Sequence, residues 1–177
     1  MKHFLSLLIA TGFLLSASSL NAQQQDKSKR PSPPATVTQK INSGATITID
    51  YSQPSIKGRT VGKDVEPMKG QVWRMGANEA TVFQTDKDVT INGQKLPAGK
   101  YSLFGLWGDD NSYTVIFNTA YNIWGTQHDE NKAKDVLKVP AKMTTANTST
   151  EKLVYTIDKS GLVTLKWGPE VISFNVK

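Results

Sequence analysis

The most constraining feature of this sequence is a two-residue alternation of apolar and polar side chains that recurs from residue 35 onward. In residues 45–51, Ala, Ile, Ile and Tyr alternate with Thr, Thr and Asp, as a half-buried strand requires. The same period returns in residues 113–118, 153–157, 163–167 and 172–176. Such short amphipathic strands predict an all-β chain whose strands each turn one face to a common core.

Turn signals separate these runs. Asn-Ser-Gly at 42–44 and Asn-Gly at 92–93 are typical of hairpin turns, because both residue types tolerate positive φ. The segment 97–101 places Tyr101 directly after a Pro/Gly turn, which resembles the tyrosine corner of Greek-key sandwiches, although an ordinary core Tyr fits equally. We predict an antiparallel β-sandwich with Greek-key-like connections and at most one short helix, near residues 127–137.

The first 34 residues differ from the rest. Residues 1–22 combine a basic start, a short apolar run and a small residue at the expected cut, the pattern of a secretory signal peptide. The run is shorter than the ~20 apolar residues that span a bilayer. Residues 23–34 are polar and predict a flexible linker, followed by one domain at 35–177. We expect an exported protein, periplasmic or secreted.

Composition excludes several classes of function. The chain has no cysteine, which removes disulfides, thiol chemistry and a lipid anchor attached at Cys. Its net charge of +6 is scattered, without the basic face and interleaved aromatics of nucleic-acid binders. A weak attraction to anionic envelope polymers fits this charge. Oligomeric state is left open.

One candidate site lies between Asp50 and Thr81, where the strand pattern is least regular. Arg supplies a planar fork for polar ligands, and Trp or Tyr supplies a flat apolar face. Alternatively, Arg74 and Glu79 pair with each other, Asn78 serves a left-handed turn, and Trp73 belongs to the core. The candidate ligand-binding residues of this region are Tyr51, Arg59, Trp73, Arg74, Asn78 and Glu79.

A second patch, residues 121–129, adds Trp124 and His128 as candidate ligand-binding residues. His3 falls in the signal peptide, so a multi-histidine zinc site is excluded within one copy, and we expect no metal and no cofactor. A serine triad through His128 lacks the Gly-x-Ser-x-Gly elbow. Paired carboxylates for glycoside cleavage could be drawn from Asp50, Glu79 and Asp129.

Several strings resemble the domain-of-unknown-function family 2911. They are Asp-Tyr-Ser-Gln-Pro at 50–54, Lys-Gly-Arg at 57–59, Val-Trp-Arg-Met-Gly-Ala-Asn-Glu-Ala-Thr at 72–81 and Leu-Pro-Ala-Gly-Lys-Tyr-Ser-Leu-Phe at 96–104. The resemblance spans residues 32–177 and implies an exported bacterial protein, with no activity attached. The family pattern usually has Arg where Gln53 stands.

We therefore hypothesise an exported β-sandwich that binds a polar ligand such as a glycan or a cell-envelope fragment. The alternatives are a hydrolase that pairs Glu79 with His128 or Asp129, and a structural envelope protein that docks a protein partner. Binding is favoured over catalysis because no motif presents a nucleophile.

Overall fold

The structure is a computed structural model that describes residues 26–177; the predicted signal peptide, residues 1–22, lies outside the described residues. Its regular secondary structure consists almost entirely of antiparallel strands, which confirms the all-β prediction. The strands are β1 (Pro34–Lys40), β2 (Thr46–Ser52), β3 (Val72–Trp73), β4 (Thr81–Thr85), β5 (Val89–Ile91), β6 (Gln94–Leu96), β7 (Gly99–Trp107), β8 (Tyr113–Asn118), β9 (Asp135–Ile157) and β10 (Leu162–Asn175). The helical turns are η1 (Lys27–Lys29), α1 (His128–Asn131) and η2 (Lys132–Lys134).

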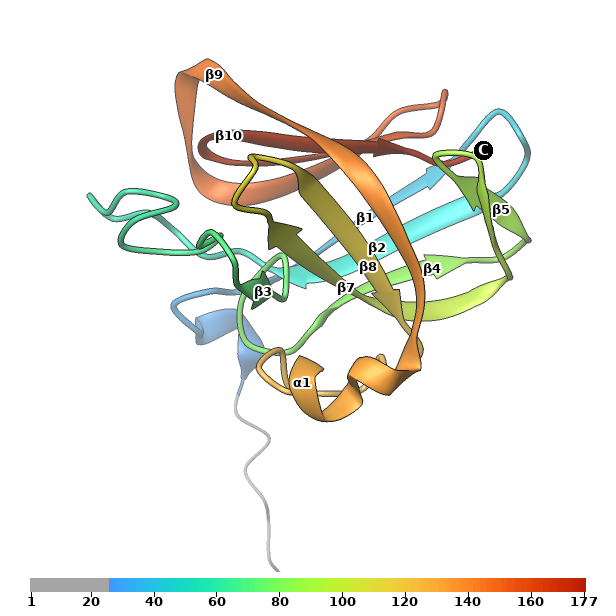
Figure 1. The fold of residues 1–177 in the computed structure, drawn as a ribbon, viewed down its shortest axis with the longest axis horizontal. Helices are drawn as coiled ribbons and strands as arrows, with labels where there is room; N and C mark the ends of the chain where they lie inside the picture. Colours follow the sequence, from blue (N-terminus) through green and yellow to red (C-terminus); the bar gives the residue numbers. More distant parts are fainter. Residues whose placement is uncertain (1–25) are drawn as a thin grey trace, which may run out of the picture.

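One continuous sheet provides both layers of the fold. Its strand order is β1-β2-β4-β7-β8-β9-β10, with β3 paired to β7, while β5 and β6 form a separate hairpin. The segment after β2 then bonds to β9, near the other end of this order: Ile56 donates to the carbonyl of Glu151, and Leu153 donates to that of Pro54. The sheet therefore curls until its ends meet, as the bent ribbons of β9 and β10 show in Figure 1.

The strand order differs from the predicted Greek-key-like connections. Apart from the short β3 and the β5–β6 hairpin, each strand pairs with the next long strand along the chain, whereas a Greek key returns a strand beside an earlier one. The physical reason is the length of β9, which pairs with β8 through its first residues and with β10 beyond them. A single long, curved strand makes the second layer without a crossover.

The core lies on the concave side of the curled sheet. The apolar residues of the alternating runs are buried there, and aromatic rings join the two layers: Trp73 stacks on Trp167 with ring centroids 6.0 Å apart, and Phe117 meets Phe174 edge to face, also at 6.0 Å. Pairs of this geometry stabilise a core beyond the area that they bury. The core cluster draws on residues from Ile41 to Val176.

The local signals of the sequence are confirmed at three positions. Asn92 and Gly93 have φ of 46° and 87° and join β5 to β6. The Tyr101 hydroxyl donates to the carbonyl of Pro97 at 2.9 Å, which is the tyrosine-corner contact. Within residues 26–177, the single α-helix, α1, begins at His128, inside the range predicted for a short helix.

The Gly-Pro-Glu string at 168–170, whose composition predicts a turn, lies inside β10. The register between β9 and β10 shifts on both sides of Gly168, whose φ is 59°. Such a bulge bends a strand without ending it, and a proline can occupy it without removing a ladder bond. The same residues that favour a turn here bend the hairpin over the core.

Across residues 26–177, no helix combines the length and apolarity needed to cross a membrane.

We predict that Gly161→Ala destabilises the protein far more than Gly93→Ala. Both glycines have φ near 90°, so each alanine pays a left-handed strain of roughly 1–2 kcal/mol. A methyl group at Gly161 would also collide with the carbonyl oxygen of Val176, whereas nothing lies within 4 Å of one at Gly93. Overpacking of that kind adds roughly 1–3 kcal/mol. Urea unfolding of both variants measures the difference; equal losses would contradict it.

Candidate functional site

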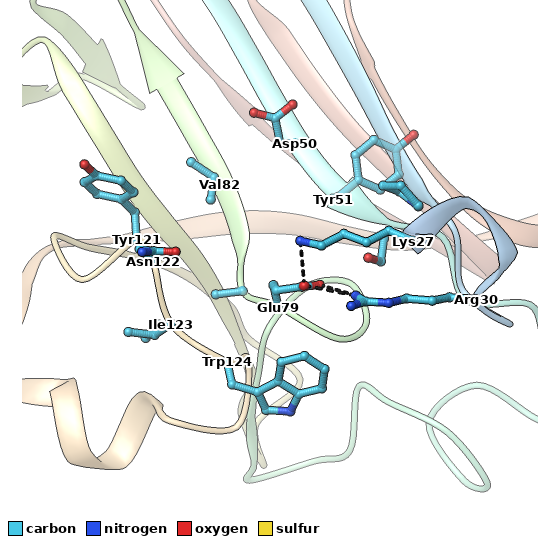
Figure 2. Close-up of a pocket in the computed structure, with 13 residues that line it drawn as sticks. Lys27, Arg30, Asp50, Tyr51, Glu79, Val82, Tyr121, Asn122, Ile123 and Trp124 are labelled. Carbon is cyan, nitrogen blue, oxygen red and sulfur yellow. Dashed lines mark hydrogen bonds and ion pairs between the residues drawn. The ribbon is translucent and has the colours of Figure 1, made fainter. Parts of the chain in front are cut away.

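A cleft of about 400 Å³ opens where the N-terminal segment, residues 26–33, approaches the sheet. Figure 2 shows its wall: Lys27 and Arg30 come from the N-terminal segment, and Asp50 and Val82 come from β2 and β4, where they are register partners. The remaining wall is formed by Pro34, Tyr51, Ser52, Glu79, Ala80 and residues 121–124. Candidate residues from both sequence patches therefore meet at one cleft.

The N-terminal segment is docked on the domain through ion pairs. Nη1 of Arg30 donates to both carboxylate oxygens of Glu79, each at 2.9 Å, and Nζ of Lys27 lies 3.0 Å from Oε1 of the same residue. The side-chain amide of Asn78 donates to the carbonyl of Ser32 at 2.9 Å. The described part of the predicted flexible linker, residues 26–34, is thus held in place, because a carboxylate 49 residues away pairs with its basic cluster.

This arrangement changes the acidity of Glu79. Partial burial opposes ionisation, but hydrogen bonds from Lys27, from the Glu79 backbone and from Arg30, with the charge of Lys27, lower the pKa of Glu79 to about 2. Its carboxylate therefore stays ionised and paired at any pH above that value, so Glu79 is an anionic anchor rather than a proton donor.

The aromatic loop, residues 119–127, is paired to residues 78–80. These are the Asn-Glu-Ala part of the string at 72–81, which is called the family string below. Glu79 and Trp124 form an isolated antiparallel bridge, the amide of Ala80 donates to Ile123, and the amide of Gly125 donates to Asn78. This backbone pairing fixes the loop beside the carboxylate anchor. It leaves Tyr121 and Trp124 with 45% and 46% of their surface exposed, at the cleft.

Arg74 and Glu79 do not pair with each other. The aliphatic part of Arg74 packs against Gly125 so closely that a methyl group there would overlap it. The Nε of Arg74 is buried without a hydrogen-bond partner among residues 26–177. Burial lowers the pKa of Arg74, and the charge of Glu66 opposes this. Arg74 therefore supports the aromatic loop from behind and does not line the cleft.

Other members of the family string hold the backbone. The Met75 carbonyl accepts hydrogen bonds from the Tyr155 hydroxyl at 2.9 Å and from Thr81 Oγ1 at 3.2 Å. A methyl group on Gly76 would lie 2.6 Å from that same Oγ1, so only glycine fits. Asn78 has φ of 61°, as the left-handed turn predicted for it requires. Much of the string is architecture that presents Glu79.

Of three further sequence-predicted residues, Trp73 and Arg59 lie away from the open cleft, whereas Tyr51 lines it with little exposed surface. Trp73 is buried and donates from Nε1 to the Tyr113 hydroxyl at 2.7 Å. Tyr51 is buried, and its hydroxyl accepts from the amide of Tyr155 at 3.3 Å. Arg59 is exposed in the loop after β2, where its guanidinium donates to the carbonyls of Ser55 and Ile56. A ligand role for Trp73 and Arg59 has no support from their positions, whereas Tyr51 is placed at the cleft.

His128 lies at a different opening, a cleft of about 350 Å³ that it lines with Thr126 and Asp129. The ring is buried against Phe104, 4.6 Å between centroids. Its Nε2 lies 3.2 Å and 3.3 Å from the two carboxylate oxygens of Asp135. The structure therefore does not bring Glu79 and His128 to one cleft.

Within residues 26–177, no three His, Cys, Asp or Glu side chains are grouped to hold a metal.

Sequence reasoning missed Lys27 and Arg30 as parts of the site, since their segment was predicted to be a free linker. The available signal was three basic residues in four positions without an acidic neighbour after them. Asp50 and Tyr121 were visible in the patches but not separable from other surface residues before the fold placed them at the cleft.

The comparisons with known proteins agree with the resemblance of the strings. The family model described as "Protein of unknown function (DUF2911)" matches residues 32–176, nearly the whole chain. Neither a curated protein nor a solved structure matches it.

We predict that Glu79→Gln releases the N-terminal segment while the sheet stays folded. Amide-exchange protection of residues 26–33 should fall roughly fivefold to tenfold, because each partly exposed ion pair contributes up to about 1 kcal/mol. Asp50→Asn is the matched control, since Asp50 lines the same cleft without touching Lys27 or Arg30. Unchanged protection in Glu79→Gln would show that the segment is held by other contacts.

The ion pairs of Glu79 make the docking of residues 26–33 depend on pH. Because folding lowers the Glu79 pKa from 4.5 to about 2, the docked state has its full stabilisation above pH 4.5 and loses it as the pH falls toward 2. Protection of residues 26–33, corrected for intrinsic exchange, should fall in that window in the unaltered protein and be flat in Glu79→Gln. A decrease of equal size in both proteins would assign the effect to another carboxylate.

Proposed function

The chain belongs to the DUF2911 family, and we propose that it is an exported binding protein that takes a glycan or a comparable polar envelope fragment in the 400 Å³ cleft. The observation that carries the proposal is the pair of exposed aromatic side chains, Tyr121 and Trp124, at one polar opening. The proposal names binding and not catalysis.

The exposure of these two rings is unusual within this protein. Among residues 26–177, the exposed large hydrophobic side chains are Tyr121, Trp124 and Val136, and both aromatic ones line the same cleft. Trp73 and Trp167, by contrast, are buried in the core. Aromatic faces at an opening suit a sugar ring, whose C–H face is apolar while its rim carries hydroxyl groups.

Polar groups around the rings fit the hydroxyl rim of such a ligand. Asp50 and Glu79 offer carboxylate oxygens, and the exposed Asn122 offers an amide that can both donate and accept. Lys27 and Arg30 add donors beside them. The four charges sum to zero, so the cleft has no net charge that would favour a charged ligand, and discrimination would come from hydrogen bonds.

Export supports an envelope ligand. The signal-peptide pattern of residues 1–22 predicts delivery outside the cytoplasm. The absence of cysteine means that the fold needs no disulfide there, since its core is large enough to stabilise it without one. Glycans and cell-wall fragments are abundant polar ligands in that compartment.

The hydrolase alternative receives less support from the geometry. Glu79 and His128 line different clefts, and the low pKa of Glu79 makes it a poor general acid. The partner-docking alternative would use the same exposed rings, so the experiment below separates it from glycan binding.

We predict that Trp124→Ala weakens glycan binding about tenfold, since an aromatic contact adds roughly 0.5–1.5 kcal/mol beyond its buried area and about 1.4 kcal/mol is tenfold. The matched control is Val136→Ala, which removes an exposed apolar side chain outside the cleft. The measurement is a titration of each purified protein with oligosaccharides and peptidoglycan fragments, followed by calorimetry.

Binding that is unchanged in Val136→Ala and about tenfold weaker in Trp124→Ala supports the proposal. Equal loss in both variants would point to non-specific apolar contact. If no soluble fragment binds, while a purified envelope protein is retained in a Trp124-dependent manner, glycan binding is wrong and the partner-docking alternative holds.

A further inference from the structure

The second cleft contains a histidine whose environment is asymmetric. On one side of the ring, Nε2 of His128 faces the carboxylate of Asp135, whose side chain is only 5% exposed. That carboxylate also accepts from the amide of Asn118 at 2.8 Å and pairs with Nζ of Lys138 at 3.1 Å. On the other side, Nδ1 is buried and has no hydrogen-bond partner among residues 26–177.

The contact with Asp135 determines which ring nitrogen of His128 carries the proton. A carboxylate accepts hydrogen bonds and does not donate them, and here two further donors, from Asn118 and Lys138, also point at the Asp135 oxygens. The proton of the neutral ring is therefore on Nε2, so Nδ1 carries a lone pair. A buried lone pair without a donor is rare in native proteins, because buried polar atoms are nearly always satisfied.

A second candidate ligand, a carboxylate oxygen, lies beside this lone pair. Oδ1 of Asp129 is 3.8 Å from Nδ1 of His128, too far for a hydrogen bond. The Asp129 side chain is 95% exposed, so its carboxylate can move without disturbing the core. Both residues line the 350 Å³ cleft, and the other wall carries Gly70, Gln71 and Val72.

We propose that this cleft binds a divalent first-row transition-metal ion of the zinc class through Nδ1 of His128 and the carboxylate of Asp129, with Asp135 as the outer-sphere partner that orients the imidazole. This site is separate from the glycan cleft and does not depend on the function proposed for it.

The distances fit such an ion after a small movement. Ligands about 2.1 Å from a tetrahedral ion lie about 3.4 Å from each other, so the observed 3.8 Å needs a shift of a few tenths of an ångström. The exposed Asp129 can supply it. The carboxylate behind the imidazole is the usual outer-sphere arrangement of a metal-bound histidine, in which the second ring nitrogen donates to a carboxylate.

The composition of the site also limits its affinity and its metal. A single histidine excludes a multi-histidine centre but not a mixed nitrogen and oxygen site completed by water in the cleft. Imidazole and carboxylate favour Zn²⁺, Ni²⁺, Co²⁺ and Cu²⁺ over Mg²⁺ or Ca²⁺, which prefer oxygen ligands alone. With two protein ligands, the ion would keep open positions toward the cleft.

The test is titration of the untagged, metal-free protein with Zn²⁺ and with Co²⁺, followed by calorimetry and by the ring nitrogen signals of His128 in NMR. In the free protein, we expect the Nε2–H tautomer. On addition of Zn²⁺, the Nδ1 signal should move to the range of a coordinated nitrogen, and Mg²⁺ should leave it unchanged. A free protein with the proton on Nδ1, or an Nδ1 signal that ignores millimolar Zn²⁺, would overturn the proposal.

Three variants separate the site from general attraction to acidic side chains. Asp129→Asn removes the exposed ligand and should weaken Zn²⁺ binding at least about tenfold, and Asp135→Asn should weaken it about 10- to 100-fold through the orientation of the ring. Glu130→Gln is the matched control, an exposed neighbour outside the cleft, and should bind as the unaltered protein does. Equal loss in Glu130→Gln and Asp129→Asn would overturn the proposal, since it would show surface binding only.

Discussion

The backbone pairing between residues 78–80 and residues 123–125 is the contact on which the candidate sites depend. It joins the loop before β4 to the loop after β8, two connections that a curled sheet brings to the same side. Glu79 and Trp124, within the paired segments, line the 400 Å³ cleft. Gly125 and Thr126, which follow Trp124 in the chain, line the cleft of His128. Because hydrogen bonds between main-chain groups leave the side chains free, this short ladder can present a carboxylate and an aromatic ring side by side. Without this pairing, the loop before β4 and the loop after β8 would not be held together.

Much of the family string supports this ladder and does not contact the cleft. The Met75 carbonyl satisfies the Tyr155 hydroxyl in the core, where burial raises the pKa of that tyrosine well above its usual value and so keeps it a donor. Gly76 leaves room for Thr81, and Arg74 fills the space that Gly125 leaves open. These residues explain why a string can be specific to a family while only a few of its side chains face solvent. The physical requirement is close packing of backbone against backbone, which restricts residue type as strictly as a ligand would.

The sequence predicts the elements of this fold better than their connections. Alternation marks β2 and β8, Asn-Gly marks the β5–β6 turn, and the Pro-Ala-Gly-Lys-Tyr string marks the Tyr101 corner, because each is a local signal of a few residues. The length of β9 and the bulge at Gly168 could not be predicted in this way. A glycine followed by a proline is compatible with a turn and with a bulge, and the choice depends on whether the partner strand continues alongside. That partner is supplied by the tertiary structure.

The sequence by itself determined the class of the fold, the local turns and the absence of thiol chemistry, since period, turn residues and composition are properties of neighbouring positions. It also identified Glu79, Trp124 and His128 as residues of interest. Only the tertiary structure decided which of them meet. Glu79 pairs with Lys27 and Arg30, and Arg74 packs against Gly125. His128 lines a separate cleft and contacts the buried Asp135. The reason is that charge and shape complementarity act through space, and the curled sheet brings together positions that are about 50 residues apart in the chain.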